Sequence, residues 1–209
     1  MKEQYGYISR QGGSRSDGTT SGGGILCISG EWHLTDTVYL SAGTSVRLEG
    51  AELFATAGVP LFRNTVVRTV RERTKLGCQS GISLLGDGSA LHGSVEFFNV
   101  KNVVLEHLSF EGAGTSLVLM YASGVRAAHL MFRNVETCIE CRIGTRNGIF
   151  TDIHTTGGET LFRFDSERLP AARRVNYAGP DVKNIIVRDA SGGAFVTVGA
   201  YCKDILTEN

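Results

Sequence analysis

The stretch "VEFFNVKNVVLEHLSFEG", residues 95–112, carries the pattern that decides the fold. A run of apolar and β-branched residues is followed by the polar turn "VKN" and then by a second run of the same kind. Residues 117–134, "LVLMYASGVRAAHLMFRN", repeat this order with the turn "ASG". Short runs separated by such turns are typical of β-strands, and no stretch sustains the 3.6-residue periodicity of an amphipathic helix. We therefore expect a chain built almost entirely from β-strands.

Three further stretches repeat this order, and the period along the chain is about 22 residues. They are residues 138–158, residues 161–193, which include the insertion "ERLPAARRVNYAG", and residues 195–209. A single repeat cannot bury its apolar face alone, so stacked repeats share one core. The sequence therefore predicts an all-β fold, a single-stranded right-handed parallel β-helix with coils of about 22 residues. We expect residues 1–209 to form one such domain, alone or within a longer β-helix.

The first half of the chain follows the same scheme less regularly. Residues 22–58 contain three strand pairs linked by short turns, and residues 82–93, "ISLLGDGSALHG", supply another coil. Residues 62–81 lie between them and predict a loop or hairpin that projects from the solenoid. This segment carries most of a basic cluster, formed by Arg63, Arg68, Arg71, Arg73 and Lys75.

Opposite charges balance over the whole chain, which holds 21 Lys and Arg and 21 Asp and Glu residues. No net field recruits nucleic acid or an anionic membrane surface, and we expect neither as a partner. Glycine is abundant at 27 residues and proline rare at 3, as expected for many tight turns. No apolar run approaches the ~20 residues of a membrane span, and the start "MKEQYGY" lacks the apolar core of a signal peptide.

The cysteines predict buried reduced thiols rather than a metal site, because they are odd in number, lack CxxC spacing and lie mostly in apolar runs. They are Cys27, Cys78, Cys138, Cys141 and Cys202. His107 and His129 occupy matching places in successive coils, but no third ligand recurs at that spacing. We therefore expect no metal and no cofactor. Reduced thiols are compatible with the cytoplasm, whereas the substrates considered below suggest an extracellular protein, so the location stays open.

Three stretches carry a resemblance to a known family. Residues 22–55, "GGGILCISGEWHLTDTVYLSAGTSVRLEGAELFA", and residues 82–93 are similar to the opening coils of the right-handed parallel β-helices of the pectin-lyase-like superfamily. Residues 138–165, "CIECRIGTRNGIFTDIHTTGGETLFRFD", resemble the catalytic coils of one group within it, the polygalacturonase-like glycoside hydrolases of family 28. The resemblance implies a polysaccharide substrate and a pair of catalytic carboxyl groups.

The family's catalytic positions are largely changed here. The resemblance places the first family Asp near Thr137 and the following Asp pair on Gly158 and Glu159. The family's His falls within "ASGGAF", residues 190–195, where there is no His. An inverting hydrolase needs two carboxyl groups roughly 6.5–9.5 Å apart. Only Glu159 retains a carboxyl group, so the family's usual mechanism does not carry over.

Strand alternation points to a second set of candidates. It directs Ile139 and Cys141 inward and Glu140 and Arg142 outward, and the next coil then directs Arg163 and Asp165 out of the same sheet. One interpretation is two exposed cross-strand pairs, Glu140 with Arg163 and Arg142 with Asp165, that contribute about 0–1 kcal/mol each. The other is a cleft with carboxylates and basic side chains. Its catalytic candidates are Glu140, Glu159, Asp165 and His154, and its substrate-binding candidates are Arg142, Arg163, Arg168 and Tyr177.

Several of these residues also have a plain structural interpretation. His154 lies beside the "TTGG" turn, where it is either a proton carrier or a surface residue. Asn102, Asn147 and Asn184 recur at one turn and predict an internal ladder of side-chain hydrogen bonds. Asp87 satisfies a turn within "GDGS". The aromatic candidates for stacking on sugar rings are Trp32, Tyr39, Tyr121, Tyr177 and Tyr201, and packing is the alternative role for most of them.

Two functions follow from these observations. The first is a polysaccharide-active β-helix, a hydrolase or lyase acting on acidic, uronic-acid-containing glycans. The second is a non-catalytic glycan-binding or structural module that descends from such an enzyme. The chain stops at "CKDILTEN" as another strand begins, so we expect either a homo-oligomer through this end of the solenoid or a longer chain.

Overall fold

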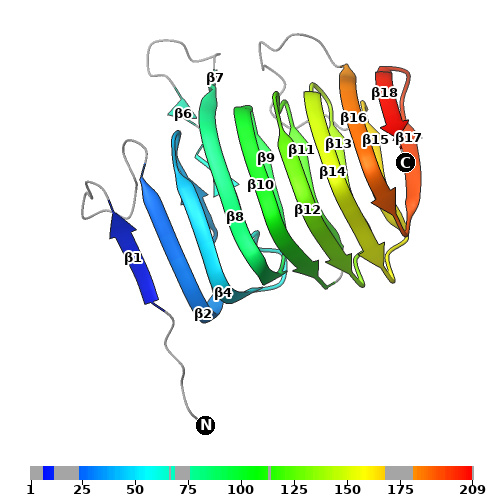
Figure 1. Cartoon of the computed structure of the whole chain (residues 1–209). Helices are drawn as coiled ribbons and strands as arrows, with labels where there is room; N and C mark the ends of the chain where they lie inside the picture. The colour runs from blue at the N-terminus through cyan, green and yellow to red at the C-terminus, as the bar shows by residue number, and fades with distance from the viewer. Residues whose placement is uncertain are drawn as a thin grey trace.

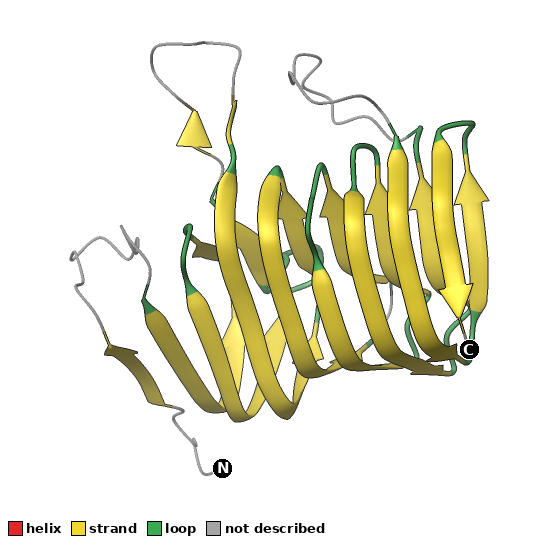
Figure 2. Ribbon diagram, turned by 45° about the horizontal axis from the view of Figure 1, so that its top comes forward, coloured by secondary structure: helices red, strands yellow, loops and turns green. Residues whose placement is uncertain are grey.

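Two long sheets run through the molecule, and the computed structural model describes residues 7–11, 24–65, 67–68, 76–112, 114–167 and 181–208. Sheet A has nine strands and sheet B has seven. None of the described residues is helical, so none belongs to a helix that could cross a membrane. Figures 1 and 2 show the strands stacked like rungs, from β1 at one end to β17 and β18 at the other.

The strands of each sheet follow one another in chain order. Sheet A consists of β1 (Tyr7–Gln11), β2 (Ile25–Leu34), β4 (Ser45–Ala55), β8 (Gln79–His92), β10 (Val100–Glu111), β12 (Arg126–Arg133), β14 (Arg146–Thr156), β16 (Val182–Ser191) and β18 (Cys202–Glu208). Sheet B consists of β3 (Val38–Leu40), β5 (Phe62–Asn64), β9 (Val95–Phe98), β11 (Thr115–Met120), β13 (Thr137–Arg142), β15 (Thr160–Asp165) and β17 (Ala194–Val198).

The chain alternates between the two sheets, which makes each coil one turn of a solenoid. Strand β10 in sheet A is followed by β11 in sheet B, and β12 then returns to pair with β10 in parallel. All pairings within the two sheets are parallel among the described residues, except that β1 pairs with β2 antiparallel. The predicted all-β parallel solenoid with coils of about 22 residues is therefore confirmed.

Columns of apolar side chains fill the space between the sheets. In sheet A, Phe110 lies opposite Phe132, and their rings stack with centroids 5.0 Å apart. In sheet B, Leu117, Ile139 and Phe162 occupy one buried column in successive coils. The predicted inward direction of Ile139 and Cys141 is confirmed, since both side chains are buried. Stacked coils thus share one core that no single coil can form.

Left-handed residues bend the chain at the corners of the coils. Asn102 and Asn147 lie near the start of β10 and β14, with φ of 54° each, and Gly124 lies just before β12, with φ of 67°. Only Gly, and less often Asn or Asp, adopts this conformation at little cost. Asn184 continues the column and donates from Nδ2 to Oδ1 of Asn147 at 3.0 Å. The predicted asparagine ladder is therefore present, but its side chains face solvent rather than the interior.

Two other expectations are met only in part. Strands β6 (Val67–Arg68) and β7 (Leu76–Gly77) pair antiparallel, as expected for a projecting hairpin, while residues 69–75 lie outside the described part. All five cysteines are free thiols. Cys138 and Cys141 are buried as predicted, whereas Cys78 is exposed, because it lies just after the hairpin rather than within a core strand.

Candidate functional site

The outer face of sheet B carries a continuous row of side chains in register. Cross-strand partners define this row from β3 to β17, one residue per strand. Its members are Tyr39, Arg63, Glu96, Val118, Glu140, Arg163 and Val196. Adjacent members are separated by the strand spacing of ~4.8 Å, so the row runs along the solenoid axis.

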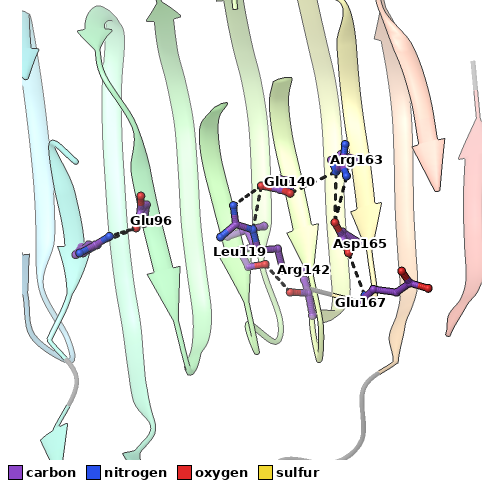
Figure 3. A network of polar contacts seen from close by, with 9 residues as sticks. Glu96, Leu119, Glu140, Arg142, Arg163, Asp165 and Glu167 are labelled. Atoms are coloured by element: carbon purple, nitrogen blue, oxygen red, sulfur yellow. Dashed lines mark hydrogen bonds and ion pairs between the residues drawn. The ribbon is translucent and has the colours of Figure 1, made fainter. Parts of the chain in front are cut away.

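Four charged residues of β13 and β15 form a cluster on this face, which Figure 3 shows from close by. The guanidinium group of Arg142 donates to Oε2 of Glu140 from both Nε and an Nη atom, at 2.9 and 2.6 Å. Arg163 Nε lies 3.4 Å from Oε1 of Glu140 and 3.4 Å from Oδ2 of Asp165. The other Asp165 oxygen accepts the Glu167 amide N–H at 3.0 Å. Two arginines therefore balance the charge of two carboxylates.

The register of this cluster was predicted correctly, but its environment was not. Glu140 lies opposite Arg163, and Arg142 lies opposite Asp165. Glu140 and Asp165 are each only 1% exposed, so the expectation of solvent-exposed pairs is wrong. Arg142 also pairs with Glu140 of its own strand, a partner that alternation did not predict. Alternation only assigns a side chain to the outer face, and that face is not everywhere open to solvent.

The shared arginine limits the distance between the two carboxylates. Oε1 of Glu140 and Oδ2 of Asp165 both lie 3.4 Å from the same Nε atom of Arg163. Those two oxygens can therefore be separated by no more than twice that distance. Paired carboxyl groups of glycoside hydrolases are ~5–5.5 Å apart in retaining enzymes and roughly 6.5–9.5 Å apart in inverting ones. The limit holds for this one pair of oxygens, and it is compatible with the retaining separation.

An open groove of about 560 Å³ adjoins the cluster on the same face. Arg142 belongs to both the cluster and the groove. The remaining lining residues are Tyr39, Arg63, Asn64, Thr65, Glu96, Phe97, Phe98, Val118 and Met120. Tyr39 is 57% exposed, and Arg63 is held by Glu96 through an Nε hydrogen bond of 2.8 Å. The groove therefore combines guanidinium groups with aromatic and apolar surface.

Asn64 fixes the wall of this groove. Its side-chain amide donates to the carbonyl of Phe98 at 2.7 Å and accepts the N–H of Phe98 at 2.7 Å. The amide thus satisfies both backbone groups of Phe98, as a neighbouring strand would. Because Asn64 is buried, this contact joins β5 to β9 at the base of the groove.

Glu159 does not belong to this site. It lies in the turn before β15, whereas Asp165 ends that strand, so their Cα atoms are about 20 Å apart along an extended chain. The Glu159 side chain is exposed and has no hydrogen-bond or ion-pair partner among the described residues. At the neighbouring Gly158, a Cβ atom would lie 2.4 Å from Oγ1 of Thr155. The resemblance aligns the family's Asp pair with Gly158 and Glu159, and this turn has no room for an Asp side chain at residue 158.

His154 lies on the other sheet. It belongs to β14 of sheet A, whereas Glu140 and Asp165 belong to sheet B. Its Nδ1 atom lies 2.7 Å from Oγ of Ser191, and its Nε2 atom lies 2.6 Å from Oδ1 of Asp152. The structure therefore does not bring His154 together with the carboxylates of sheet B.

Arg168 and Tyr177, the other two predicted substrate-binding residues, lie outside the described residues, as does the rest of the insertion after Glu167.

The sequence analysis did not group Glu96, Phe98 and Met120 with the site, although these residues line the groove. Aligning the coils by the repeat would have found Glu96, because it shares the outward row with Glu140. No cluster of metal ligands occurs within the described ranges.

Comparisons with known proteins find this fold among polysaccharide-degrading enzymes. No family model and no curated protein matches the chain. It is similar to the family GH82 iota-carrageenase from A. fortis, at 17% identity and a TM-score of 0.64, over 83% of this chain and 43% of that one. An iota-carrageenase complexed to iota-carrageenan fragments gives 16% identity and a TM-score of 0.63, over 81% and 41% of the two chains.

A third structure is an inferred glycosyl hydrolase from Parabacteroides merdae, at 15% identity and a TM-score of 0.56, over 85% of this chain and 93% of that one. Identities this low establish a shared β-solenoid fold and nothing finer. The chain spans less than half the length of the two carrageenases. These structures lend no support to family 28 in particular, and that assignment stays a hypothesis.

Proposed function

We propose that this β-helix is a polysaccharide-active protein, related to glycoside hydrolases, that binds an acidic glycan along the outer face of sheet B. The observation that carries the proposal is the groove of about 560 Å³, which combines guanidinium and aromatic side chains and shares Arg142 with the buried carboxylate cluster. The fold shared with carrageenases is compatible with this function but does not select it. The likeness of residues 138–165 to family 28 remains our hypothesis for its ancestry.

The side chains of the groove match the chemistry of an acidic sugar. A guanidinium group binds a carboxylate or sulfate through two parallel hydrogen bonds, and Arg63 and Arg142 both reach this groove. Tyr39 offers an exposed ring on which the apolar face of a pyranose can stack. Since the row runs along the solenoid axis, a glycan chain lying parallel to that axis would contact successive coils.

Cleavage would use Glu140 and Asp165 as the carboxyl pair. In a retaining hydrolase one carboxyl group attacks the anomeric carbon while the other donates a proton to the leaving oxygen. The limit set by Arg163 allows the separation that this chemistry needs. A bound acidic sugar would compete with Glu140 for Arg142, and the carboxylate would then become available to the sugar.

A second function, glycan binding without cleavage, is favoured by the burial of this pair. Glu140 and Asp165 are each 1% exposed, and arginine neutralises both, as in a structural ion-pair cluster. A catalytic carboxyl group must touch its substrate, and neither group does so without a rearrangement of its arginine partner.

A product-release assay on a panel of acidic and neutral polysaccharides separates the two functions. We expect wild-type protein to release reducing or unsaturated ends from an acidic glycan, and Glu140→Gln or Asp165→Asn to abolish the release. Glu159→Gln, an exposed glutamate away from the groove, is the matched control and should retain activity.

Circular dichroism verifies that each variant is folded. Tyr39→Ala tests the groove separately, because Tyr39 lines the groove and is not part of the buried charge cluster. Full activity in folded Glu140→Gln and Asp165→Asn variants would refute the proposed catalytic pair. Binding of an acidic glycan without release of any ends would assign the second function. Neither binding nor release across the panel would refute both.

A further inference from the structure

Five side chains on the outer face of sheet A form a connected polar chain. The rings of His107 and His129 stack with centroids 4.5 Å apart. His129 Nδ1 then lies 2.5 Å from Oδ2 of Asp152. The second oxygen of Asp152 lies 2.6 Å from Nε2 of His154, whose Nδ1 atom lies 2.7 Å from Oγ of Ser191. A hydroxyl group, an imidazole and a carboxylate therefore follow one another through hydrogen bonds, from Ser191 through His154 to Asp152.

The carboxylate determines which nitrogen of His154 carries the proton. An ionised carboxylate only accepts hydrogen bonds, so Nε2 of His154 must donate to Asp152. In a neutral imidazole the other nitrogen, Nδ1, is then an acceptor. It therefore receives the hydroxyl proton of Ser191, 2.7 Å away. This is the relation between nucleophile, base and orienting group that activates a serine hydroxyl.

Asp152 is well suited to the orienting role. The pKa of Asp152 is lowered, chiefly by the hydrogen bond from His129 and also by that from His154. Its backbone has φ of 56°, at the same left-handed position as His129 with φ of 55° in the preceding coil. His129 therefore holds the oxygen that His154 does not use, which fixes the carboxylate from both sides.

Hydrogen-bond donors for an oxyanion directly follow the serine. Ser191 is exposed and ends β16, and Gly192 and Gly193 come next. Neither glycine N–H has an acceptor within the described part of the chain. A Cβ atom at residue 192 would lie 2.0 Å from the Thr155 carbonyl oxygen, so only glycine fits this turn. Free backbone N–H groups beside a nucleophile are what an oxyanion hole requires.

We propose that Ser191, His154 and Asp152 form a serine-hydrolase site that cleaves acyl esters, with Ser191 as the nucleophile. The site lies on sheet A and is separate from the groove on sheet B. Its substrate class is a small or surface-accessible carboxylic ester, since Ser191 is exposed and the side chains of His154 and Asp152 are partly exposed. The proposal is independent of glycan binding in the groove.

The chemistry balances without any cofactor. Oγ of Ser191 forms a bond to the carbonyl carbon of the ester while its proton passes to Nδ1 of His154, and the N–H groups of Gly192 and Gly193 stabilise the oxyanion. The tetrahedral intermediate then loses the alcohol, which takes the proton from His154. Water, deprotonated by His154, attacks the acyl-serine, releases the carboxylic acid and regenerates the hydroxyl group.

Labelling with a fluorophosphonate tests the site directly, because the probe forms a stable adduct with an activated serine. We expect the wild-type protein to be labelled, with the adduct located on Ser191 by mass spectrometry, and to hydrolyse p-nitrophenyl acetate. Ser191→Ala should abolish labelling, and His154→Gln and Asp152→Asn should each slow it by about 100-fold or more. Ser80→Ala is the matched control, because Ser80 is also exposed and contacts Asn102 rather than a histidine.

Circular dichroism and a urea unfolding curve verify that each variant is folded. Loss of labelling in the three site variants together with full labelling of Ser80→Ala would support the site. An unlabelled wild-type protein, or an adduct on a serine other than Ser191, would overturn it. Unchanged labelling of Ser191 in folded His154→Gln would overturn the assigned base.

Discussion

At the residue scale, two glutamates that the sequence offers as catalytic candidates have opposite environments. Glu140 is 1% exposed and pairs with Arg142 and Arg163, whereas Glu159 is exposed and unpaired within the described residues. Removing one partner of a buried ion pair leaves uncompensated charge and typically costs about 3–5 kcal/mol. The same change at an exposed, unpaired site usually stays within about 0.5 kcal/mol.

We therefore predict that Glu140→Gln lowers the free energy of unfolding by about 3 kcal/mol. Glu159→Gln should leave it unchanged within about 0.5 kcal/mol. Urea unfolding followed by circular dichroism measures both variants against the wild type. Equal stability of the two variants would show that the Glu140 cluster does not stabilise the fold.

Asp87 gives a pH-dependent prediction. The pKa of Asp87 is lowered, first by the hydrogen bond from the Ser89 hydroxyl, with a further contribution from the Gly50 N–H. A carboxyl group with a lowered pKa in the folded state stabilises the fold above its unfolded pKa, and this contribution is lost as pH falls through the folded value. Asp87→Ala should therefore destabilise the protein at pH 7, by no more than about 1 kcal/mol because solvent screens this exposed carboxylate.

The stability difference between Asp87→Ala and wild type should shrink below pH of about 4. Thermal melts at a series of pH values measure this convergence. Asp36→Ala, at an exposed carboxylate without a partner among the described residues, is the control and should show no such difference. A constant difference at every pH would contradict the role of the Asp87 carboxylate.

At the element scale, much of each coil could be predicted because its signals are local. Alternation in β13 and β15 correctly gave the inward residues and the pairing of Glu140 with Arg163. The left-handed residues at the start of the sheet A strands are also a local signal, since Asn and Gly adopt positive φ at little cost, as Asn147 and Gly124 do here. The burial of Glu140 and the wall of the groove could not be predicted, because they depend on side chains from other coils, such as Asn64.

The left-handed backbone of Asn147 at a corner of its coil allows a prediction about stability. Asn147 has φ of 54° and is exposed, so its backbone conformation rather than its packing restricts the residue type. A β-branched side chain in this conformation costs about 1–2 kcal/mol more than glycine. We predict that Asn147→Val is less stable than Asn147→Gly by about this amount in urea unfolding. Equal stabilities would mean that the corner relaxes to another conformation.

For the whole molecule, the exposed apolar surface of the last coil suggests self-association. Phe195 belongs to the interior column of sheet B, where it stacks on Phe162, yet it remains 42% exposed. Tyr201 and Leu206 are also exposed large side chains in this coil. We expect this surface to form a homo-oligomeric contact, because association would remove these exposed apolar side chains from water.

Sedimentation over a range of concentrations tests this contact. We predict a mass above that of one chain at high concentration and its loss in Phe195→Asp. Tyr39→Asp, an exposed position on the opposite terminal strand of sheet B, is the control and should still associate. A strictly monomeric wild-type protein would contradict the prediction.

The central claim for the whole molecule is that sheet B binds an acidic glycan in its groove. Affinity electrophoresis in gels containing an acidic or a neutral polysaccharide tests it most directly, with Tyr201→Ala as the control because this exposed tyrosine lies outside the groove. We predict that an acidic polysaccharide retards the wild-type protein and Tyr201→Ala, and that Tyr39→Ala and Arg63→Ala lose the retardation. Wild-type migration unaffected by every acidic polysaccharide, or retardation unchanged in both groove variants, would contradict the claim.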